Sequence, residues 1–269
     1  MGDVKTDNIM LQNEGLLEIL GKISYKSWEE TVKREPEWRN MENLLPKFGF
    51  GPFSVLMVTT GLNDYQLKGK AEIAYWPKIK HILENSTVPK SIEEMYSILE
   101  SFYMNERLNK QKIARLRKIF NSQIAKFLWN SSPKEVSQNF IRIWREISWV
   151  MGQKRDAKTI VFAMKCLGIA LLMVGEYGFD FKPIPVPVDS RVASFTKKLD
   201  SKISTDEETR KYWTDVLIEL NKNNPKVTMI HLDSLIWQIS PLDSYEFKRY
   251  FAILGETEVG EKLCKLLDL

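Results

Sequence analysis

The sequence predicts an all-α protein, and three observations support this. Apolar residues recur at helical spacing along the chain, helix start signals are frequent, and the alternation of apolar and polar residues typical of a β-strand is nearly absent. Of the 269 residues, 43% are hydrophobic and 28% are charged, so the chain can bury a large core and is not disordered as a whole.

N-capping residues mark several helix starts. A serine three residues ahead of a glutamate has the spacing of a capping box, and it occurs twice: Ser91 with Glu94, and Ser204 with Glu207. Ser132 predicts a third start, because the proline that follows it suits the first position of a helix. Two stripes predict buried helix faces: Ile73, Trp76, Ile79 and Leu83 in one helix, and Phe140, Ile143, Trp144, Ile147 and Val150 in another.

The segment 159–174, TIVFAMKCLGIALLMV, is almost uniformly apolar, and Lys165 is its single charge. It is shorter than the roughly 20 apolar residues that a helix needs to span a bilayer. We therefore predict the central buried helix of a globular protein and no association with a membrane. The lysine inside this helix then requires an explanation.

Residues 182–188, KPIPVPV, form the one clear non-helical stretch. Their three prolines remove hydrogen-bond donors and favour extended backbone, so we expect a stiff connector. Since no internal repeat or low-complexity linker is present, residues 1–269 are expected to form one unit with two lobes.

The cysteine and histidine content limits the possible chemistry. Cys166 and Cys264 are too few for a disulfide framework, a four-cysteine zinc site or a cysteine-ligated iron–sulfur cluster. With His81 and His231 as the only histidines, no histidine-based catalytic site is indicated. Residues 1–7, MGDVKTD, lack the basic and apolar stretches of a secretory signal, so we expect a cytoplasmic protein in a reducing environment.

Residues 106–120 are locally basic, with six cations against the single acid Glu106. On a helix, five of these cations lie opposite the apolar side chains of Leu108, Ile113, Leu116 and Ile119. The simpler interpretation is a solvated helix face, and the alternative is a surface that contacts phosphates. Because the net charge is only +4, binding of nucleic acid would depend on local patches of this kind.

Lys158, Phe162 and Lys165 are spaced so that they share one face of a helix. Two ammonium groups close together at low dielectric favour the neutral amine in one of them, and a neutral lysine is a nucleophile that can form a Schiff base. The alternative is structural: Lys158 starts the helix in solvent, while Lys165 snorkels or pairs with a carboxylate.

Asp189 follows the connector directly, in the segment PVDSR, and is predicted to cap the N-terminus of the next helix. A helix N-terminus also holds a carboxylate ionised at a fixed place. An ordinary cap and a functional acid are therefore both compatible with this position.

Further motifs follow one another along the chain: YQLKGKAE at 65–72 with Trp76 beyond it, DAKTIVFAMK at 156–165, PVDSR at 187–191, and Asp233 with Trp237. In this order they resemble the helix-hairpin-helix superfamily of DNA glycosylases, and more narrowly the archaeal 8-oxoguanine DNA glycosylases. The resemblance implies an all-α, two-lobed fold with the active site in the interlobe cleft. It also implies a bifunctional DNA repair enzyme that excises 8-oxoguanine and then nicks the strand.

By this resemblance, Lys158 would attack C1′ of the damaged nucleotide, displace the base and form a Schiff base, after which β-elimination cleaves the strand. Asp189 would stabilise the positive charge that develops on the sugar. That chemistry requires no metal or organic cofactor. The expected partner is DNA that contains 8-oxoguanine, and no obligate protein partner is evident.

The resemblance also assigns the residues that bind the flipped base. Phe162 and Trp237 would sandwich the 8-oxoguanine, although either could equally be a core aromatic residue. Polar contacts of the family's base pocket map to Asp233, Lys165 and Trp76. Where the family has a base-reading glutamine, this sequence has Glu37, in the segment EPEW at 35–38.

The expected hairpin, GQKRDAK at 152–158, lacks the closely spaced glycines of the wider superfamily. Gln153, Lys154 and Arg155 are candidates for DNA contacts there, together with Arg191, and a solvated turn is the alternative for Lys154 and Arg155. Three further alternatives stay open: a glycosylase of different base specificity, a monofunctional enzyme, and a helix-hairpin-helix protein that binds DNA without catalysis.

Overall fold

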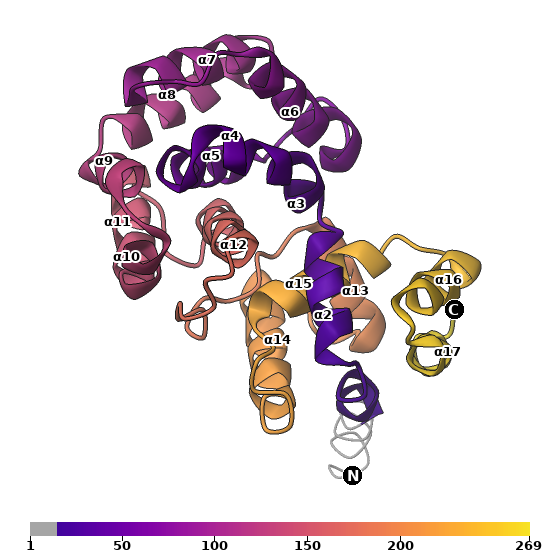
Figure 1. Ribbon diagram of the computed structural model, residues 1–269. Coiled ribbons are helices and arrows are strands. Elements are labelled where there is room, and N and C mark those ends of the chain that lie inside the picture. Colours follow the sequence, from indigo (N-terminus) through magenta and orange to yellow (C-terminus); the bar gives the residue numbers. More distant parts are fainter. Residues whose placement is uncertain (1–14) are drawn as a thin grey trace. The chain divides into compact units, whose positions relative to one another are not determined.

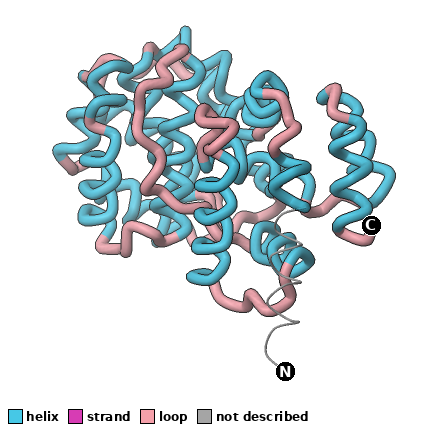
Figure 2. Tube along the Cα trace, turned by 90° about the horizontal axis from the view of Figure 1, so that it is seen from below, coloured by secondary structure: helices cyan, strands magenta, loops and turns pink. Residues whose placement is uncertain are grey.

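The computed structural model describes residues 15–269, and over this range the protein consists of helices and loops, without a strand (Figures 1 and 2). The all-α prediction is therefore confirmed. Residues 1–7, which gave the expectation about secretion, lie outside the described residues. No helix within 15–269 combines the length and the apolar character that crossing a membrane would require.

The chain divides into two compact units, which are described separately below. The middle unit is Pro36–Pro183, and the terminal unit combines the described residues up to Glu35 with Ile184–Leu269. Their boundary falls inside the proline-rich connector, whose residues 182–188 are neither helix nor strand, as predicted. A single two-lobed unit over residues 1–269 stays a prediction.

The elements of the middle unit, in chain order, are α3 (Pro36–Met41), the 3₁₀ turn η1 (Glu42–Leu44), α4 (Leu45–Phe48), α5 (Phe50–Asn63), the π-helical turn η2 (Ala71–Tyr75), α6 (Trp76–Asn85), α7 (Ile92–Met104), α8 (Asn109–Phe120), α9 (Gln123–Asn130), α10 (Pro133–Gln138), α11 (Phe140–Met151) and α12 (Lys158–Met173). The terminal unit contains α2 (Tyr25–Lys33), α13 (Ser190–Leu199), α14 (Asp206–Leu220), α15 (Met229–Ile239), α16 (Ser244–Leu254) and α17 (Thr257–Leu266).

Helix α12 packs against α5 within the middle unit, and also contacts α11 and α3. Its residues from Ile160 to Leu171 are buried apart from Phe162, so the predicted central buried helix is confirmed. The two backbones approach closely at Gly61, where a Cβ atom would lie 2.9 Å from the Cα atom of Ala163 and 2.9 Å from Sγ of Cys166. This contact fixes the position of α12, which carries three of the candidate site residues.

The predicted start of α10 is confirmed, since Ser132 and Glu135 form a complete capping box. Ser91 also caps α7, but the Glu94 carboxylate accepts the N–H of Lys90 at 2.8 Å. The prediction for α14 is wrong by one residue.

Thr205, rather than Ser204, is the N-cap of α14, and its partner is Glu208 rather than Glu207. In this register one carboxylate oxygen of Glu208 accepts the N–H groups of both Ser204 and Thr205, each at 3.0 Å. The helix starts at this register, and not at the neighbouring one, because two free N–H donors are then satisfied.

The stripe predicted for α11 is confirmed at Phe140, Ile143, Trp144 and Ile147, and the buried face ends at Met151 instead of Val150. The other stripe fails at Ile73, which is 71% exposed, while Trp76, Ile79 and Leu83 are buried. Ile73 lies in the π-helical turn that precedes α6. The wider turn rotates its side chain away from the face that α6 buries.

Helix α8 carries the basic segment, and its burial departs from the predicted pattern at two residues. Leu108 precedes the helix in a left-handed conformation (φ +56°) and is exposed rather than part of the apolar face. Lys112 is fully buried, with its Nζ 5.2 Å from the ring centroid of Tyr65 and 5.7 Å from that of Tyr75. Lys112 is therefore a core residue of the middle unit.

Helix α15 of the terminal unit begins with a buried histidine. The ring Nδ1 of His231 accepts the N–H of Thr228 at 3.1 Å, which completes the helix cap. Burial lowers the pKa of His231 to about 4, from its ordinary value of 6.5. His231 is thus neutral and structural, as the sequence indicates.

Acidification is expected to destabilise the protein through His231. Since the folded-state pKa lies below the unfolded one, the stabilisation is complete above pH 6.5 and is lost as the pH falls towards 4. The expected loss is about 2 kcal/mol of unfolding free energy between pH 7.5 and pH 5. Urea unfolding at both pH values measures it, and the same loss in a His231→Asn variant would contradict the assignment.

Candidate active site

Lys158 is the first residue of α12 and lies at the surface of the middle unit. Its side chain makes no hydrogen bond or ion pair with any described residue. It lines a cavity of about 630 Å³, termed the Lys158 cavity, whose other lining residues are Tyr65, Gln66, Gln111, Ala114, Arg115, Lys118, Gln153 and Thr159. The amine is therefore open to a ligand.

The three residues expected to share a helix face lie on α12, and they differ in burial. Lys165 is 2% exposed and its Nζ lies 5.9 Å from the ring centroid of Phe162, which is half-buried. Lys158 is exposed, so it does not lie in the low-dielectric surroundings that were expected to favour its neutral amine. It starts the helix in solvent, as the structural alternative expected.

The hairpin joins α11 to α12, and hydrogen bonds define its conformation. Gly152 ends α11 in the left-handed region (φ +63°), and the Oγ–H of Ser148 donates to the carbonyl of Gln153 at 2.6 Å. The indole N–H of Trp144 donates to the carbonyl of Arg155 at 2.9 Å. One glycine and two side-chain hydrogen bonds thus define the conformation of this hairpin.

The candidate DNA-contacting residues of the hairpin differ in their exposure and in their contacts. Lys154 and Arg155 are exposed, and the Arg155 guanidinium lies 5.5 Å from the ring centroid of Trp144. Gln153 is half-buried, and its Oε1 accepts hydrogen bonds from Arg115 at 2.9 Å and from Thr159 at 3.2 Å. Gln153 therefore belongs to the wall of the Lys158 cavity.

Glu37 and Trp76 are both buried in the middle unit. Glu37 lies in the first turn of α3, which packs against both α6 and α12. The indole N–H of Trp76 donates to Oδ2 of Asp64 at 3.0 Å. Sequence reasoning missed Asp64, although it directly precedes the YQLKGKAE segment. Its carboxylate accepts the only hydrogen bond that the side chain of Trp76 can donate.

The terminal unit brings together Asp189, Arg191 and Trp237. Asp189 caps α13 as predicted, because its Oδ1 accepts the N–H groups of Arg191 and Val192, both at 2.9 Å. Its Oδ2 accepts the indole N–H of Trp237 at 3.2 Å. Three donors thus hold this carboxyl group in place.

Helix α15 carries one aromatic and one acidic candidate of the terminal unit, Trp237 and Asp233. Trp237 is half-buried, and the Arg191 guanidinium lies 4.0 Å from its ring centroid, a cation–π contact. Asp233 is buried one turn earlier on the same helix. The structure therefore places Lys158, Phe162, Lys165 and Gln153 in the middle unit, and Asp189, Arg191, Asp233 and Trp237 in the terminal unit.

Sequence comparison defines the class of protein as an N-glycosylase and DNA lyase, an enzyme of base excision repair. A model of the AGOG family, described as N-glycosylase/DNA lyase, matches residues 17–265, and the chain belongs to this family. Curated N-glycosylase/DNA lyases are similar over most of their length. The protein of Thermococcus kodakarensis is 27% identical over 225 residues (80% of this chain, 73% of that one), and the protein of Methanococcus maripaludis is 28% identical over 233 residues (83% and 86%).

A solved structure has a similar fold. It is described as an 8-oxoguanine DNA glycosylase from Pyrobaculum aerophilum in complex with 8-oxoguanosine. The TM-score is 0.69 with 20% sequence identity, and the match covers 92% of this chain and 97% of the other. At this identity the likeness supports the helical glycosylase fold.

Proposed function

We propose that this N-glycosylase/DNA lyase excises 8-oxoguanine from DNA and cleaves the strand through a Schiff base on Lys158. The observation that carries the proposal is the state of the Lys158 side chain. It is exposed, it lines a cavity, and within the described residues no hydrogen bond or ion pair occupies its amine. A lysine that must attack a sugar carbon needs this availability.

The chemistry follows from the amine. Neutral Lys158 attacks C1′, the N-glycosidic bond breaks, and its electron pair leaves with the base, which takes up a proton. Nζ then loses a proton, the C1′–O4′ bond breaks, O4′ takes up a proton, and an iminium ion forms between Nζ and C1′. Loss of a proton from C2′ breaks the C3′–O3′ bond, so the 3′-phosphate leaves by β-elimination. Asp189 is proposed to stabilise the positive charge that develops on the sugar and to assist proton movement.

The base is proposed to stack on Phe162 and Trp237 and to be read by Asp233, Lys165 and Glu37. Trp76, which the resemblance also assigned to the base pocket, already donates its indole N–H to Asp64, so we assign it no polar contact to the base. The groups that distinguish 8-oxoguanine from guanine are its O8 acceptor and its N7–H donor. An acceptor that faces N7–H rejects guanine, whose N7 is itself an acceptor, because a buried polar group would stay unpaired at a cost of about 1–3 kcal/mol. Gln153, Lys154, Arg155 and Arg191 are proposed to contact the DNA.

Borohydride trapping tests this function. Three duplexes are compared: one with a single 8-oxoguanine, one with an abasic site and one without damage. We expect a covalent adduct with the first two and none with the third. An adduct with the abasic duplex alone would mean that the enzyme is a lyase whose base specificity is not for 8-oxoguanine. If the folded protein formed no adduct with any duplex, a monofunctional enzyme or binding without catalysis would be favoured.

Replacing Trp237 by alanine is expected to weaken binding to the 8-oxoguanine duplex by about 1–3 kcal/mol, the value of one base-stacking contact. The substitution also removes the hydrogen bond to Asp189. Trp237→Phe separates the two effects, since it keeps an aromatic face without the N–H. Titration of both variants with the uncleaved duplex measures the loss, and equal binding by Trp237→Ala and the wild type would exclude stacking.

A further inference from the structure

The Lys158 cavity carries positive charge in addition to that of Lys158, and the proposed reaction gives these further cations no role. Besides Lys158, two cations line it, Arg115 and Lys118 from α8. None of the described residues that line it is acidic. A concave site with several cations and no carboxylate favours an anion.

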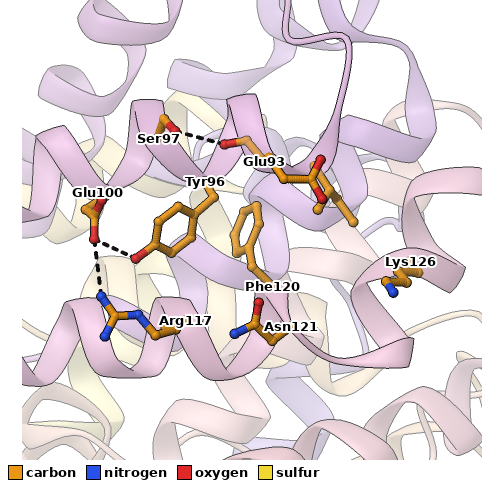
Figure 3. Close-up of a pocket in the computed structure, with 9 residues that line it drawn as sticks. Glu93, Tyr96, Ser97, Glu100, Arg117, Phe120, Asn121 and Lys126 are labelled. Carbon is orange, nitrogen blue, oxygen red and sulfur yellow. Dashed lines mark hydrogen bonds and ion pairs between the residues drawn. The ribbon is translucent and has the colours of Figure 1, made fainter.

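A second cavity that borders the same helix is lined by acids as well as by cations. It lies between α7 and α8, also has a volume of about 630 Å³, and is lined by Glu93 and Glu100 as well as by Arg117 and Lys126 (Figure 3). There Glu100 lies 3.6 Å from Arg117 and accepts the hydroxyl of Tyr96 at 2.5 Å (Figure 3). Acids accompany the cations of that cavity, whereas those of the Lys158 cavity have none.

Arg115 is held in the wall of the Lys158 cavity by neutral groups, and no carboxylate of the described residues forms an ion pair with it. Its guanidinium donates to Oε1 of Gln153 at 2.9 Å and to Oγ1 of Thr159 at 3.0 Å, and both acceptors are neutral. The guanidinium also lies 5.3 Å from the ring centroid of Tyr65. Burial lowers the pKa of Arg115, as expected for a cation partly removed from water.

The same hydrogen bonds leave donors free at the cavity. Because Oε1 of Gln153 already accepts from Arg115 and Thr159, its remaining polar group is the donor Nε2, which bonds to no described residue. The ammonium of Lys118 is exposed and likewise has no partner within residues 15–269. These free groups donate only, and they match a ligand that only accepts hydrogen bonds.

We propose that the Lys158 cavity is a binding subsite for one phosphodiester group of the DNA, with Lys118 and Nε2 of Gln153 as its contacts and Arg115 as a positioning residue. The inference rests on the proposed function in one respect, namely that Lys158 acts on a sugar of the DNA. Each sugar of a strand carries phosphodiesters on both sides, so a sugar at Lys158 brings a phosphate close to the other lining residues.

The experiment uses a duplex with a tetrahydrofuran abasic analogue, which the enzyme cannot cleave. For Lys118→Gln, the dependence of log affinity on log salt concentration is expected to become shallower by about one unit, the value for one lost phosphate contact. The control is Lys110→Gln, which makes the same charge change on α8 at an exposed residue outside both cavities. An equal change in both variants, or none in Lys118→Gln, would overturn the proposal.

A second measurement locates the phosphate. In a series of these duplexes, each carries one neutral methylphosphonate in place of a single phosphodiester. At one position the wild type is expected to lose affinity while Lys118→Gln loses none, because the contact is already absent. Losses that add at every position would contradict the subsite. The duplex lacks the damaged base, so failure of the proposed function is seen separately, as a missing adduct on the 8-oxoguanine strand.

Discussion

Lys158→Gln is expected to abolish both the borohydride adduct and strand cleavage, while binding of the tetrahydrofuran duplex stays within a few-fold of the wild type. A carboxamide has no nucleophilic amine and cannot form an iminium ion. The residue is exposed and without a partner among the described residues, so its replacement leaves no buried group unpaired. Trapping on the abasic duplex, where base recognition plays no part, gives the cleanest measurement.

Lys134→Gln is a matched control for this experiment. It makes the same charge change at an exposed residue of α10 that lines neither cavity, and wild-type trapping is expected. Retained cleavage by Lys158→Gln would identify another nucleophile. Lys165 would be the first to examine, because it lies on the same helix two turns further on.

Asp189→Asn is expected to slow release of the base by about 10²–10⁴-fold, the range of a positioned acid or base. The amide removes the negative charge that is proposed to stabilise the developing cation, whereas its oxygen can still cap α13 by accepting from Arg191 and Val192. Single-turnover measurements on the 8-oxoguanine duplex, at saturating enzyme, separate this rate from binding.

The matched control for this variant is Asp243→Asn. Asp243 caps α16 in the same unit, and its Oδ1 accepts the N–H of Glu246 at 2.8 Å, so the chemical change and the capping role are alike. Thermal unfolding is expected to shift little in both variants, and base release to slow only in Asp189→Asn. Wild-type rates in Asp189→Asn would reduce this residue to a helix cap.

The fold could be predicted from the sequence wherever one local pattern decides the structure. The apolar run at 159–174 and the stripe from Phe140 to Ile147 correspond to buried faces of α12 and α11. The errors occur where a local alternative competes. Ile73 was misplaced because a π-helical turn gives no apolar signature, and the α14 start was misplaced because Ser204 and Thr205 can both cap a helix.

The candidate site was likewise predictable where a local pattern places a residue, and not where long-range contacts do. Helical spacing placed Lys158, Phe162 and Lys165 on α12, and a proline-rich connector placed Asp189 at the N-terminus of α13. The hydrogen bonds around these residues were not predictable, because they join positions far apart in sequence. Arg115 reaches Gln153 across 38 residues, and Trp237 reaches Asp189 across 48. No periodicity within one helix reports such contacts.

The two proposed catalytic residues differ in what else depends on them. The carboxylate of Asp189 caps α13 and accepts the indole of Trp237, so folding alone gives a reason to keep it. Lys158 has no comparable structural task among the described residues. In a descendant that had lost activity, the aspartate would persist through selection for stability, while the lysine would drift. The lysine is therefore the more informative marker of a working enzyme when homologous genes are compared.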